Sequence, residues 1–317
     1  MQITTLIPAY KPQYLVELLI ALRNQTVKPA RVIISDDSPD QAFRSMILAE
    51  PIRSAVADLN IDVVHGPCRG PSMNFHYLLQ IFREQGGTEL FHIQLDDDIP
   101  YPTFYEQHLQ AHQGRGINCA VSRRWTASEN GQPLRDLPIP PAIKQSAHRL
   151  ISLDSKLLFE HTVGLSSNWL GEYSNATFRS EMAVELDDLT LAGISFAGLE
   201  DLGAFLKASL GRPVAFINEP LGYFRLSANQ RSADPMGHPL KMAHLAYVAL
   251  AIAGRELNQI SPEHCAIVLG SLCPVVESRY GQEADMSIIC ALMPSLARGD
   301  VGAEAAFLAQ WKIQCRS

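Results

Sequence analysis

The segment Phe91-His-Ile-Gln-Leu-Asp96-Asp97-Asp98-Ile-Pro-Tyr-Pro102 is an apolar run that ends in three adjacent carboxylates. The run predicts a buried strand. Because strand residues alternate between faces, we expect Asp96 and Asp98 to point the same way from its end. Adjacent carboxylates repel one another unless a cation neutralises them, and hard oxygen ligands of this kind suit Mg²⁺ or Mn²⁺. The alternative is a solvated acidic turn before Pro100.

Two further apolar runs end in polar residues nearer the N-terminus. They are Ile3-Thr-Thr-Leu-Ile-Pro8-Ala-Tyr10 and Val32-Ile-Ile-Ser-Asp36-Asp37-Ser-Pro-Asp40. Helical stretches separate the three runs, which predicts a parallel α/β sheet with polar residues at the carboxyl ends of its strands. In open sheets of this kind, ligands bind at that edge.

At these residues the sequence resembles the family 2 glycosyltransferases, inverting enzymes with a GT-A fold, over roughly residues 1 to 232. Four segments carry the resemblance in the family's order: Leu6-Ile-Pro8-Ala-Tyr10 with the helix reaching Gln25-Thr26, Ile34-Ser-Asp36-Asp37-Ser38, Gln94-Leu-Asp96-Asp97-Asp98 with Pro102, and Gly198-Leu-Glu200-Asp201-Leu. The resemblance implies a Rossmann-like, mostly parallel central sheet flanked by helices. Residues 1–100 would form a nucleotide-binding half and residues 101–235 an acceptor half.

The resemblance also implies roles for the acidic residues. Asp96, Asp97 and Asp98 would anchor Mn²⁺ or Mg²⁺, which stabilises the diphosphate leaving group of a nucleotide-sugar donor. The attacking acceptor hydroxyl must lose its proton to a carboxylate, and the resemblance puts Asp201 in that role. Glu200 would orient the acceptor or cap the helix. The alternative for this pair is an ordinary acidic first turn that interacts with the helix dipole.

Candidate nucleotide contacts lie in the first two segments. Asp37 can accept the imide N–H of uracil or thymine, which favours UDP- or dTDP-sugars, while Tyr10 can stack on the base and Pro8 shapes the turn. A capping role for Asp37 and a half-buried position for Tyr10 are the alternatives. Asp36 either contacts the nucleotide or bonds backbone N–H groups and holds the loop.

The chain departs from the family pattern after the third predicted strand. Where many members carry G-x-x-x-A-R-N, this sequence has Gly70-Pro-Ser-Met73-Asn74, so the usual arginine is missing. Arg69 precedes a predicted helix start, where it and free backbone N–H groups can meet a phosphate; a solvated arginine is the alternative. Asn74 is the other candidate nucleotide contact here. No Q-x-x-R-W follows the E-D segment, which argues against a processive polysaccharide synthase.

Two further residues have open interpretations. His238 lies beyond Phe224–Arg231, in a region where some GT-A enzymes place a third metal ligand, and the alternative is a surface histidine. Trp169 lies in residues 164–179, where the family's acceptor and donor-sugar pocket lies, and it either stacks on a sugar or belongs to the core.

Composition is typical of a soluble enzyme. The 317 residues are 47% hydrophobic and 19% charged, enough for a large core. The formal net charge of −7 argues against a nucleic-acid partner, which needs a concentrated basic surface. Six cysteines without a C-x-x-C motif indicate reduced thiols in a cytosol.

Neither the N-terminus nor the most apolar segment of the chain indicates a membrane segment. The N-terminus enters a predicted strand directly, so no signal peptide is indicated. The most apolar segment, Met242–Gly254, is too short to span a bilayer and predicts a buried helix. The expected location is the cytoplasm, with peripheral contact at the inner face of the membrane left open.

The second half of the chain contains two recognisable regions. Arg124–Arg149, with Asn130-Gly131 and four prolines, predicts a long surface loop that covers the active site. From Leu240 onward, helical spacing predicts a C-terminal helical subdomain over residues 236–317. Its expected breaks lie near three prolines: Pro262, Pro274 and Pro294.

The resulting interpretation is an inverting, metal-dependent transferase that moves a sugar to a hydroxyl of a carbohydrate, lipid-linked or protein acceptor. A haloacid-dehalogenase-like phosphatase also places D-x-D after a strand and uses Mg²⁺. It would leave Asp36 and Asp37 unexplained, and no clear G-D-x-x-x-D follows. A catalytically silent sugar-nucleotide binding protein on the same fold is the other alternative; the intact Asp98 and Asp201 argue against it.

Overall fold

The computed structural model describes residues 1–227 and 234–315, and the expected end of the family resemblance at residue 232 lies outside them. The chain divides into two compact units that interleave along the sequence. The first contains Met1–Leu153, Leu170–Asp187 and Gly211–Leu226. The second contains Asp154–Trp169, Asp188–Leu210 and the described residues from Ser227 on. A single boundary near residue 235 therefore does not separate them, because two internal segments belong with the C-terminal helices.

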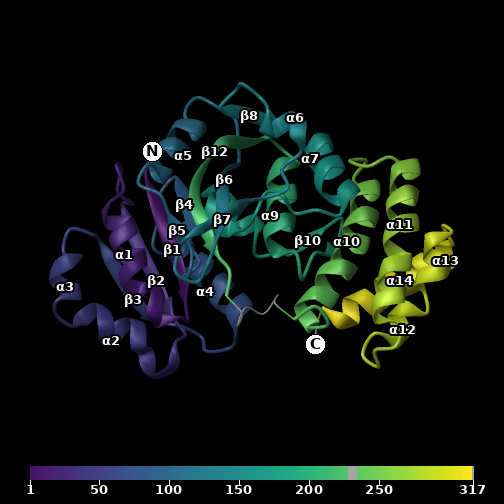
Figure 1. Ribbon diagram of the computed structural model, residues 1–317, viewed down its shortest axis with the longest axis horizontal. Helices are drawn as coiled ribbons and strands as arrows, with labels where there is room; N and C mark the ends of the chain where they lie inside the picture. The colour runs from purple at the N-terminus through teal and green to yellow at the C-terminus, as the bar shows by residue number, and fades with distance from the viewer. Residues whose placement is uncertain (228–233, 316–317) are drawn as a thin grey trace. The chain divides into compact units, whose positions relative to one another are not determined.

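A mixed sheet forms the centre of the first unit (Figure 1). Over the described residues it has ten strands in the order β3-β2-β1-β4-β9-β6-β12-β5, with β7 paired to β6 and β8 to β12. The strands are β1 (Ile3–Ala9), β2 (Arg31–Asp36), β3 (Ile61–His65), β4 (Leu90–Ile93), β5 (Ile99–Pro100), β6 (Cys119–Ala127), β7 (Pro133–Asp136), β8 (Leu150–Leu153), β9 (Ala176–Arg179) and β12 (Val214–Arg225).

The predicted parallel sheet is confirmed for the N-terminal strands. β1 pairs in parallel with β2 and β4, and β2 with β3. The register places Ala9 opposite Asp36, and Asp36 opposite His65. Because parallel strands end at the same edge, the polar residues that follow them gather there. β9 then joins this parallel half to β6 by antiparallel pairing on both of its sides.

Helices cover both faces of this sheet. Phe91 and His92 are neighbours on β4 and point to opposite faces. The Phe91 ring lies 5.3 Å from Phe82 of α4, whereas His92 lies 4.7 Å from Phe104 of α5. The helical segments of the first unit are η1 (Pro12–Tyr14), α1 (Leu15–Arg23), η2 (Pro39–Gln41), α2 (Ala42–Leu48), α3 (Ile52–Ala55), α4 (Pro71–Glu84), α5 (Phe104–His112), α6 (Pro141–Lys144), η4 (Tyr173–Asn175) and α8 (Met182–Glu185).

Helix α1 shows how sequence spacing makes the core. Its four buried leucines recur at three- and four-residue intervals and so form one apolar stripe, consisting of Leu15, Leu18, Leu19 and Leu22. The stripe packs with alternate residues of β1, among them Ile3 and Ile7, in one buried cluster. This packing fixes the chain that leaves β1, which is the segment that reaches the candidate site.

The long loop expected over Arg124–Arg149 is wrong for much of its length. β6 continues to Ala127, turns through Gly131 (φ +76°) and returns as the antiparallel β7, and the short helix α6 follows. Asn130-Gly131 is thus a hairpin signal, because glycine accepts the positive φ of a tight turn. An ion pair between Arg123 and Asp136 crosses the hairpin.

The second unit is mostly helical. Its elements are α7 (Ser155–Thr162), η3 (Val163–Leu165), β10 (Thr190–Leu191), β11 (Ile194–Ser195), α9 (Glu200–Ser209), α10 (His238–Glu256), α11 (Pro262–Tyr280), α12 (Ser287–Cys290), α13 (Met293–Ala297) and α14 (Val301–Gln314). Met242–Gly254 falls within α10 and is largely buried, as predicted. Trp169 is 1% exposed and its indole N–H donates to the His161 carbonyl, so the core interpretation is confirmed.

Two of the three expected helix breaks are confirmed. Pro262 and Pro294 lie in the first turns of α11 and α13, where a missing N–H is harmless. The break expected at Pro274 is wrong, because α11 continues through it to Tyr280. Packing of α11 against α10 and α13, which lie beside it in Figure 1, outweighs the lost hydrogen bond.

None of the helices that the structure describes combines the length and apolarity needed to cross a bilayer. All six cysteines belong to the described residues and are free thiols.

Three buried histidines lie where α5 packs on the sheet of the first unit: His92 belongs to β4, and His108 and His112 belong to α5. Thr177 Oγ1 lies 2.9 Å from His108 Nδ1 and 3.0 Å from His112 Nε2. His92 Nε2 lies 3.0 Å from the Ser174 carbonyl oxygen. All three side chains are 0% exposed, so a proton on any ring would be taken out of water.

Burial lowers the pKa of His92 and His112 to about 3 and that of His108 well below its usual value. Arg179 and the neighbouring imidazoles add to the effect on His112 and His108. Since an unfolded histidine titrates near 6.5, the unfolded chain binds more protons below that pH. The stability contributed by the neutral rings is complete above pH 6.5 and is lost as the pH falls towards the folded pKa values.

We predict that His108→Phe makes the free energy of unfolding less dependent on pH between 6.5 and 5. One buried histidine contributes about 1.4 kcal/mol per pH unit to this slope. Urea unfolding at several pH values measures it, and the exposed His148→Gln serves as the control whose slope stays that of the wild type. Identical slopes for His108→Phe and the wild type would contradict the prediction.

Candidate active site

The three aspartates lie in a turn between β4 and β5. β4 ends at Ile93, so the strand alternation expected for Asp96 and Asp98 is wrong. The backbone N–H of Asp98 donates to the Leu95 carbonyl over 3.3 Å. The Gln94 side chain closes the same turn, because its Nε2 donates to the carbonyls of Leu95 and Asp98 at 2.9 Å each. The turn sends the three carboxylates to three different partners.

Asp96 connects this turn to the loop that follows β1. Its Oδ2 accepts hydrogen bonds from the backbone N–H groups of Tyr10 and Lys11, each at 2.6 Å. Burial raises the pKa of Asp96 to about 6, and the two N–H groups oppose that rise. The first and third motifs of the sequence therefore meet at one carboxylate.

Asp97 forms an ion pair with the ammonium of Lys11. Burial by itself lowers the pKa of Lys11, but its hydrogen bond to Asp97 and the fields of all three aspartates outweigh burial and raise this pKa above 10.5. Lys11 is a residue that the sequence analysis missed. Its only signal was its place directly after Tyr10, the last residue of the first motif.

Asp98 is the most deeply buried of the three, at 1% exposed. Its Oδ1 accepts a hydrogen bond from the backbone N–H of Arg225 over 3.2 Å, while its buried Oδ2 has no hydrogen-bond partner within residues 1–227 and 234–315. Burial, followed by the charges of Asp97 and Glu172, raises the pKa of Asp98 well above its usual value, and the Ser174 hydroxyl and the Arg124 charge oppose that rise. A buried oxygen without a partner is a place where a ligand is expected.

The turn fits a divalent cation only in part. Over the described residues, no three His, Cys, Asp or Glu side chains are grouped so as to hold a metal by themselves. Mg²⁺ is ordinarily held by one or two protein carboxylates, and waters and substrate phosphates complete its shell. Asp98 and its neighbours can supply that carboxylate share, with Asp98 Oδ2 as the available oxygen.

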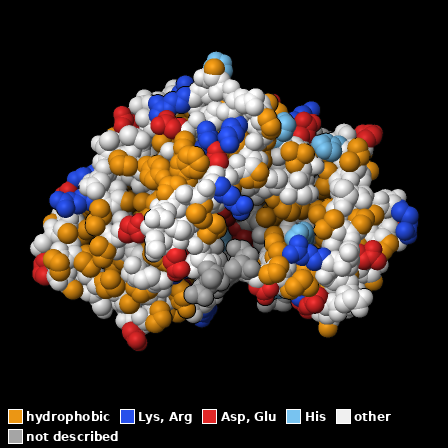
Figure 2. Space-filling view, in the orientation of Figure 1, with side chains coloured by type: hydrophobic (Ala, Val, Ile, Leu, Met, Phe, Trp, Pro, Cys, Tyr) orange, Lys and Arg blue, Asp and Glu red, His pale blue; other side chains and the backbone are white. Residues whose placement is uncertain are grey.

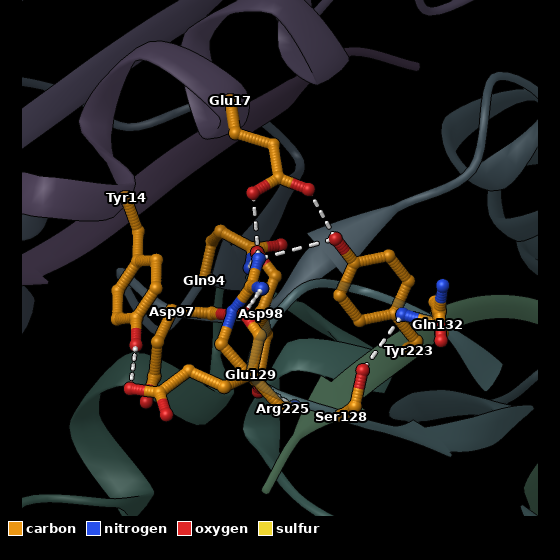
Figure 3. A network of polar contacts seen from close by, with 10 residues as sticks. All are labelled: Tyr14, Glu17, Gln94, Asp97, Asp98, Ser128, Glu129, Gln132, Tyr223 and Arg225. Atoms are coloured by element: carbon orange, nitrogen blue, oxygen red, sulfur yellow. Dashed lines mark hydrogen bonds and ion pairs between the residues drawn. The ribbon is translucent and has the colours of Figure 1, made fainter. Parts of the chain in front are cut away.

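Arg225 braces the aspartate turn from β12 (Figure 3). Its Nε donates to the Asp97 carbonyl over 3.0 Å, and its Nη2 donates to Glu17 over 2.7 Å. The Tyr14 ring lies 4.4 Å from the guanidinium, and Nη1 donates to the Glu129 carbonyl. This role of Arg225 has no local signal in the sequence, because its partners come from distant segments of the chain.

A second buried arginine lies beside Asp98. Arg124 pairs with Glu172, and its guanidinium lies 4.4 Å from the Phe224 ring. Burial raises the pKa of Glu172, and Arg124 opposes that rise. Nε and Nη1 of Arg124 are buried and have no hydrogen-bond partner among the described residues. Neither member of this pair belongs to one of the four sequence motifs.

The loop after β2 is held by Asp36. This carboxylate accepts hydrogen bonds from the Ser38 backbone N–H and the Arg44 backbone N–H, each at 2.9 Å, and from the Ser38 hydroxyl. Its side chain is 1% exposed. The interpretation that Asp36 holds the loop is confirmed by these contacts, and a nucleotide contact stays a prediction.

Asp37 is half-buried and faces the loop after β3. Its Oδ1 accepts the Cys68 backbone N–H over 2.9 Å. A Cβ on Gly66 would lie 2.0 Å from the same oxygen, so any other residue there would displace the Asp37 carboxylate. Asp37 thus links the loop after β2 to the loop after β3. Its role in binding the base of the nucleotide stays a prediction.

The remaining candidates of this edge differ in exposure. Tyr10 is 62% exposed, so the half-buried alternative is wrong and its ring faces solvent. Pro8 is half-buried in β1, opposite Ser35. Asn74 is 2% exposed and donates to the Ser35 carbonyl over 3.2 Å, while its Oδ1 has no partner among the described residues. Arg69 is exposed and lies just before α4, the helix start predicted there.

Glu200 and Asp201 belong to the second unit and open α9, as predicted. Glu200 Oε1 accepts the Gly198 backbone N–H over 2.8 Å. A Cβ on Gly198 (φ +89°) would lie 2.8 Å from the Met242 backbone, so this turn requires glycine. His238 is exposed at the start of α10. The catalytic role of the pair and the metal role of His238 stay predictions.

Charges of both signs are scattered over the face of the molecule drawn in Figure 2. Lys and Arg side chains lie among Asp and Glu side chains on this face and do not gather into one basic area.

No family model matches this sequence, and no curated protein matches it. Solved structures do match. S. aureus TarS 1-349 in complex with UDP-GlcNAc has a TM-score of 0.57 and 14% identity over 100% of this chain and 91% of that chain. The same protein in complex with UDP gives 0.51 and 12% identity over the same shares. In the longer TarS chain, 95% of this chain matches 54% of that one, with a TM-score of 0.54 and 13% identity.

These likenesses show the fold. The chain has a glycosyltransferase fold of the GT-A kind, with a large, mostly parallel central sheet flanked by helices and with helices at the C-terminus. The fold class expected from the sequence is confirmed.

We predict that Arg225→Met lowers the free energy of unfolding by about 2 to 4 kcal/mol, because it leaves the buried Asp97 carbonyl and the partly buried Glu129 carbonyl unpaired. The expected loss extends down to the lower value because Glu17, the ion-pair partner of Arg225, has a side chain that is 48% exposed and can be solvated once the arginine is gone. Guanidinium unfolding measures the change. Arg115→Met, at an exposed arginine that donates to Gln110, is the matched control and should change stability by less than about 0.5 kcal/mol. Equal losses in the two variants would refute the bracing role.

Proposed function

We propose that this protein is an inverting, metal-dependent glycosyltransferase that moves a sugar from a nucleotide-diphosphate donor to a hydroxyl acceptor. The observation that carries the proposal is the buried aspartate turn at the carboxyl edge of a glycosyltransferase fold, where Asp98 Oδ2 has no partner among the described residues. A buried carboxylate oxygen at a ligand-binding edge needs a cation or a hydrogen-bond donor to offset its burial.

The donor that we propose is a UDP- or dTDP-sugar. S. aureus TarS has been solved with UDP and with UDP-GlcNAc, which makes UDP-GlcNAc the first donor to test. Asp37 would accept the imide N–H of the base, and the exposed ring of Tyr10 would stack on it beside Pro8. Asn74 and Arg69, at the start of α4, would contact the nucleotide and its phosphates. Asp36 would keep the loop of Asp37 in place.

The cofactor that we propose is Mn²⁺ or Mg²⁺, held by Asp98 with Asp97 and Asp96 and with His238 as a further candidate ligand. When bound, such an ion stabilises the negative charge that develops on the diphosphate leaving group. The chain's own part is to keep the carboxylates in place. Asp96 is held by two backbone N–H groups, and the carbonyl of Asp97 is held by Arg225.

The general base that we propose is Asp201. An inverting transfer needs one carboxylate that takes the proton of the acceptor hydroxyl during attack. Asp201 lies in the first turn of α9, where the helix dipole stabilises a negative charge. Glu200, which accepts the Gly198 N–H, would hold the start of the helix and orient the acceptor. The acceptor class that we propose is a carbohydrate, a lipid-linked molecule or a protein.

We predict that UDP binding depends on Mn²⁺ and that Asp98→Asn weakens the metal-dependent part by about 1 to 3 kcal/mol, the range for losing a charge-assisted contact. Isothermal titration with and without Mn²⁺ measures it. Asp58→Asn removes a carboxylate that pairs with Lys28 at the surface and should bind UDP as the wild type does. A titration that is the same with and without Mn²⁺ would count against the metal. Release of inorganic phosphate from phosphate esters would instead indicate a phosphatase.

We predict that Asp201→Asn keeps the affinity for UDP but lowers sugar transfer by about 10²- to 10⁴-fold, because the amide has the shape of the carboxylate without its basicity. Glu200→Gln should cost less. Asp188→Asn, at an exposed aspartate of the same unit that pairs with Lys207, is the control with normal turnover. A thermal-shift screen of nucleotide sugars finds the donor. NMR of the product then reads its anomeric configuration, and a retained configuration would remove Asp201 from this role.

A further inference from the structure

Lys11 touches the aspartate turn twice. Its backbone N–H donates to Asp96 Oδ2 over 2.6 Å, and its ammonium pairs with Asp97 Oδ2. The Asp97 side chain is 9% exposed and that of Lys11 is 37% exposed. The backbone of Lys11 is therefore tied to one carboxylate of the turn, while its flexible stem brings a positive charge to the next one.

The two buried arginines near the turn form ion pairs with glutamates outside it. Arg124 pairs with Glu172, and Arg225 pairs with Glu17. Toward the turn itself Arg225 offers hydrogen bonds to the Asp97 carbonyl and the Asp98 carboxylate, the latter from its backbone. Within residues 1–227 and 234–315, the pair with Lys11 is the one ion pair made by any of the three aspartates.

We propose that the Lys11 ammonium is the resident cation of the aspartate turn, and that a divalent ion binds only by displacing it from Asp97. The inference rests on the proposed function and adds a residue that controls metal uptake. A metal ion and an ammonium at the same carboxylate repel one another, so the pair weakens the affinity of the turn for metal alone. Because the backbone N–H stays bonded to Asp96, only the side chain of Lys11 has to move.

The displacement couples metal binding to donor binding. A nucleoside diphosphate brings negative charge that attracts both the metal ion and the displaced ammonium. It therefore offsets the repulsion between these two cations, which is not offset when metal binds without the donor. Metal and UDP should therefore bind with positive cooperativity, and Lys11 is the residue that makes metal alone bind weakly. In the free protein Lys11 would offset the charge of Asp97, and the turn would take up its metal together with the donor.

Mn²⁺ binding followed by electron paramagnetic resonance, with and without UDP, tests the proposal without any turnover. In the absence of UDP, Lys11→Met should bind Mn²⁺ about tenfold more tightly than the wild type, a modest factor because the pair is partly exposed and screened. Lys11→Arg keeps the charge and should stay close to the wild type. Lys28→Met removes the ammonium from a surface lysine–aspartate pair in the same unit and should change nothing.

A second set of variants ties the effect to Asp97. Lys11→Gln repeats the measurement with a polar neutral side chain and should match Lys11→Met. In an Asp97→Asn background, Lys11→Met should add no further Mn²⁺ affinity, because the carboxylate that the two cations share is gone.

The outcomes separate the inference from the function on which it rests. If the wild type binds Mn²⁺ with UDP but the neutral Lys11 variants bind metal alone no more tightly, the inference is overturned and the proposed metal dependence stands. A gain in Lys11→Arg equal to that in Lys11→Met, or a gain that persists with Asp97→Asn, would also overturn it. If neither the wild type nor any variant binds Mn²⁺ with UDP, the metal-dependent function itself fails.

Discussion

Repulsion among three carboxylates in one buried turn is the constraint around which the first unit is arranged. Counted as whole residues, Asp96, Asp97 and Asp98 are each no more than 6% exposed, so water does little to screen them. The chain compensates each in a different way: two backbone N–H groups for Asp96, an ammonium for Asp97 and one backbone N–H for Asp98. Asp98 is the most buried of the three, and its Oδ2 has no hydrogen-bond partner among the described residues.

The sheet makes this compensation possible by bringing together segments that are remote in sequence. β5 pairs with β12 so that Pro100 lies opposite Gly222, and β12 then runs past the turn to Arg225. A Cβ on Gly222 would lie 2.8 Å from the Ile99 carbonyl, so glycine permits this approach. The carboxylates of Asp96 and Asp98 are thus held by backbone N–H groups, and the buried guanidinium of Arg225 holds the Asp97 carbonyl. Lys11 is different, because it supplies its charge through a partly exposed, flexible stem.

Sequence reasoning succeeded where hydrophobic periodicity and chain order carry the information. Apolar runs that end in polar residues gave the parallel strands, and the E-D segment gave the start of α9. It failed where a local signal had two meanings. Asn130-Gly131 indicated a loop but forms a hairpin, and Pro274 indicated a break but lies inside α11, where packing compensates for the lost hydrogen bond. The strand expected to carry the aspartates, β4, ends at Ile93, so Asp96 and Asp98 lie in a turn and do not follow the alternation of a strand.

The sequence by itself determined the α/β class, the sheet edge at which acidic side chains gather and the kind of chemistry that carboxylates at such an edge support. Only the tertiary structure decided which partner each carboxylate has. Asp96 bonds residues 86 and 85 positions away, and Asp98 bonds one 127 positions away. Coulomb energy and hydrogen bonding depend on distance in space and on burial, and neither can be read from separation along the chain. The roles of Lys11, Arg124 and Arg225 therefore emerge only once the sheet has closed around the turn.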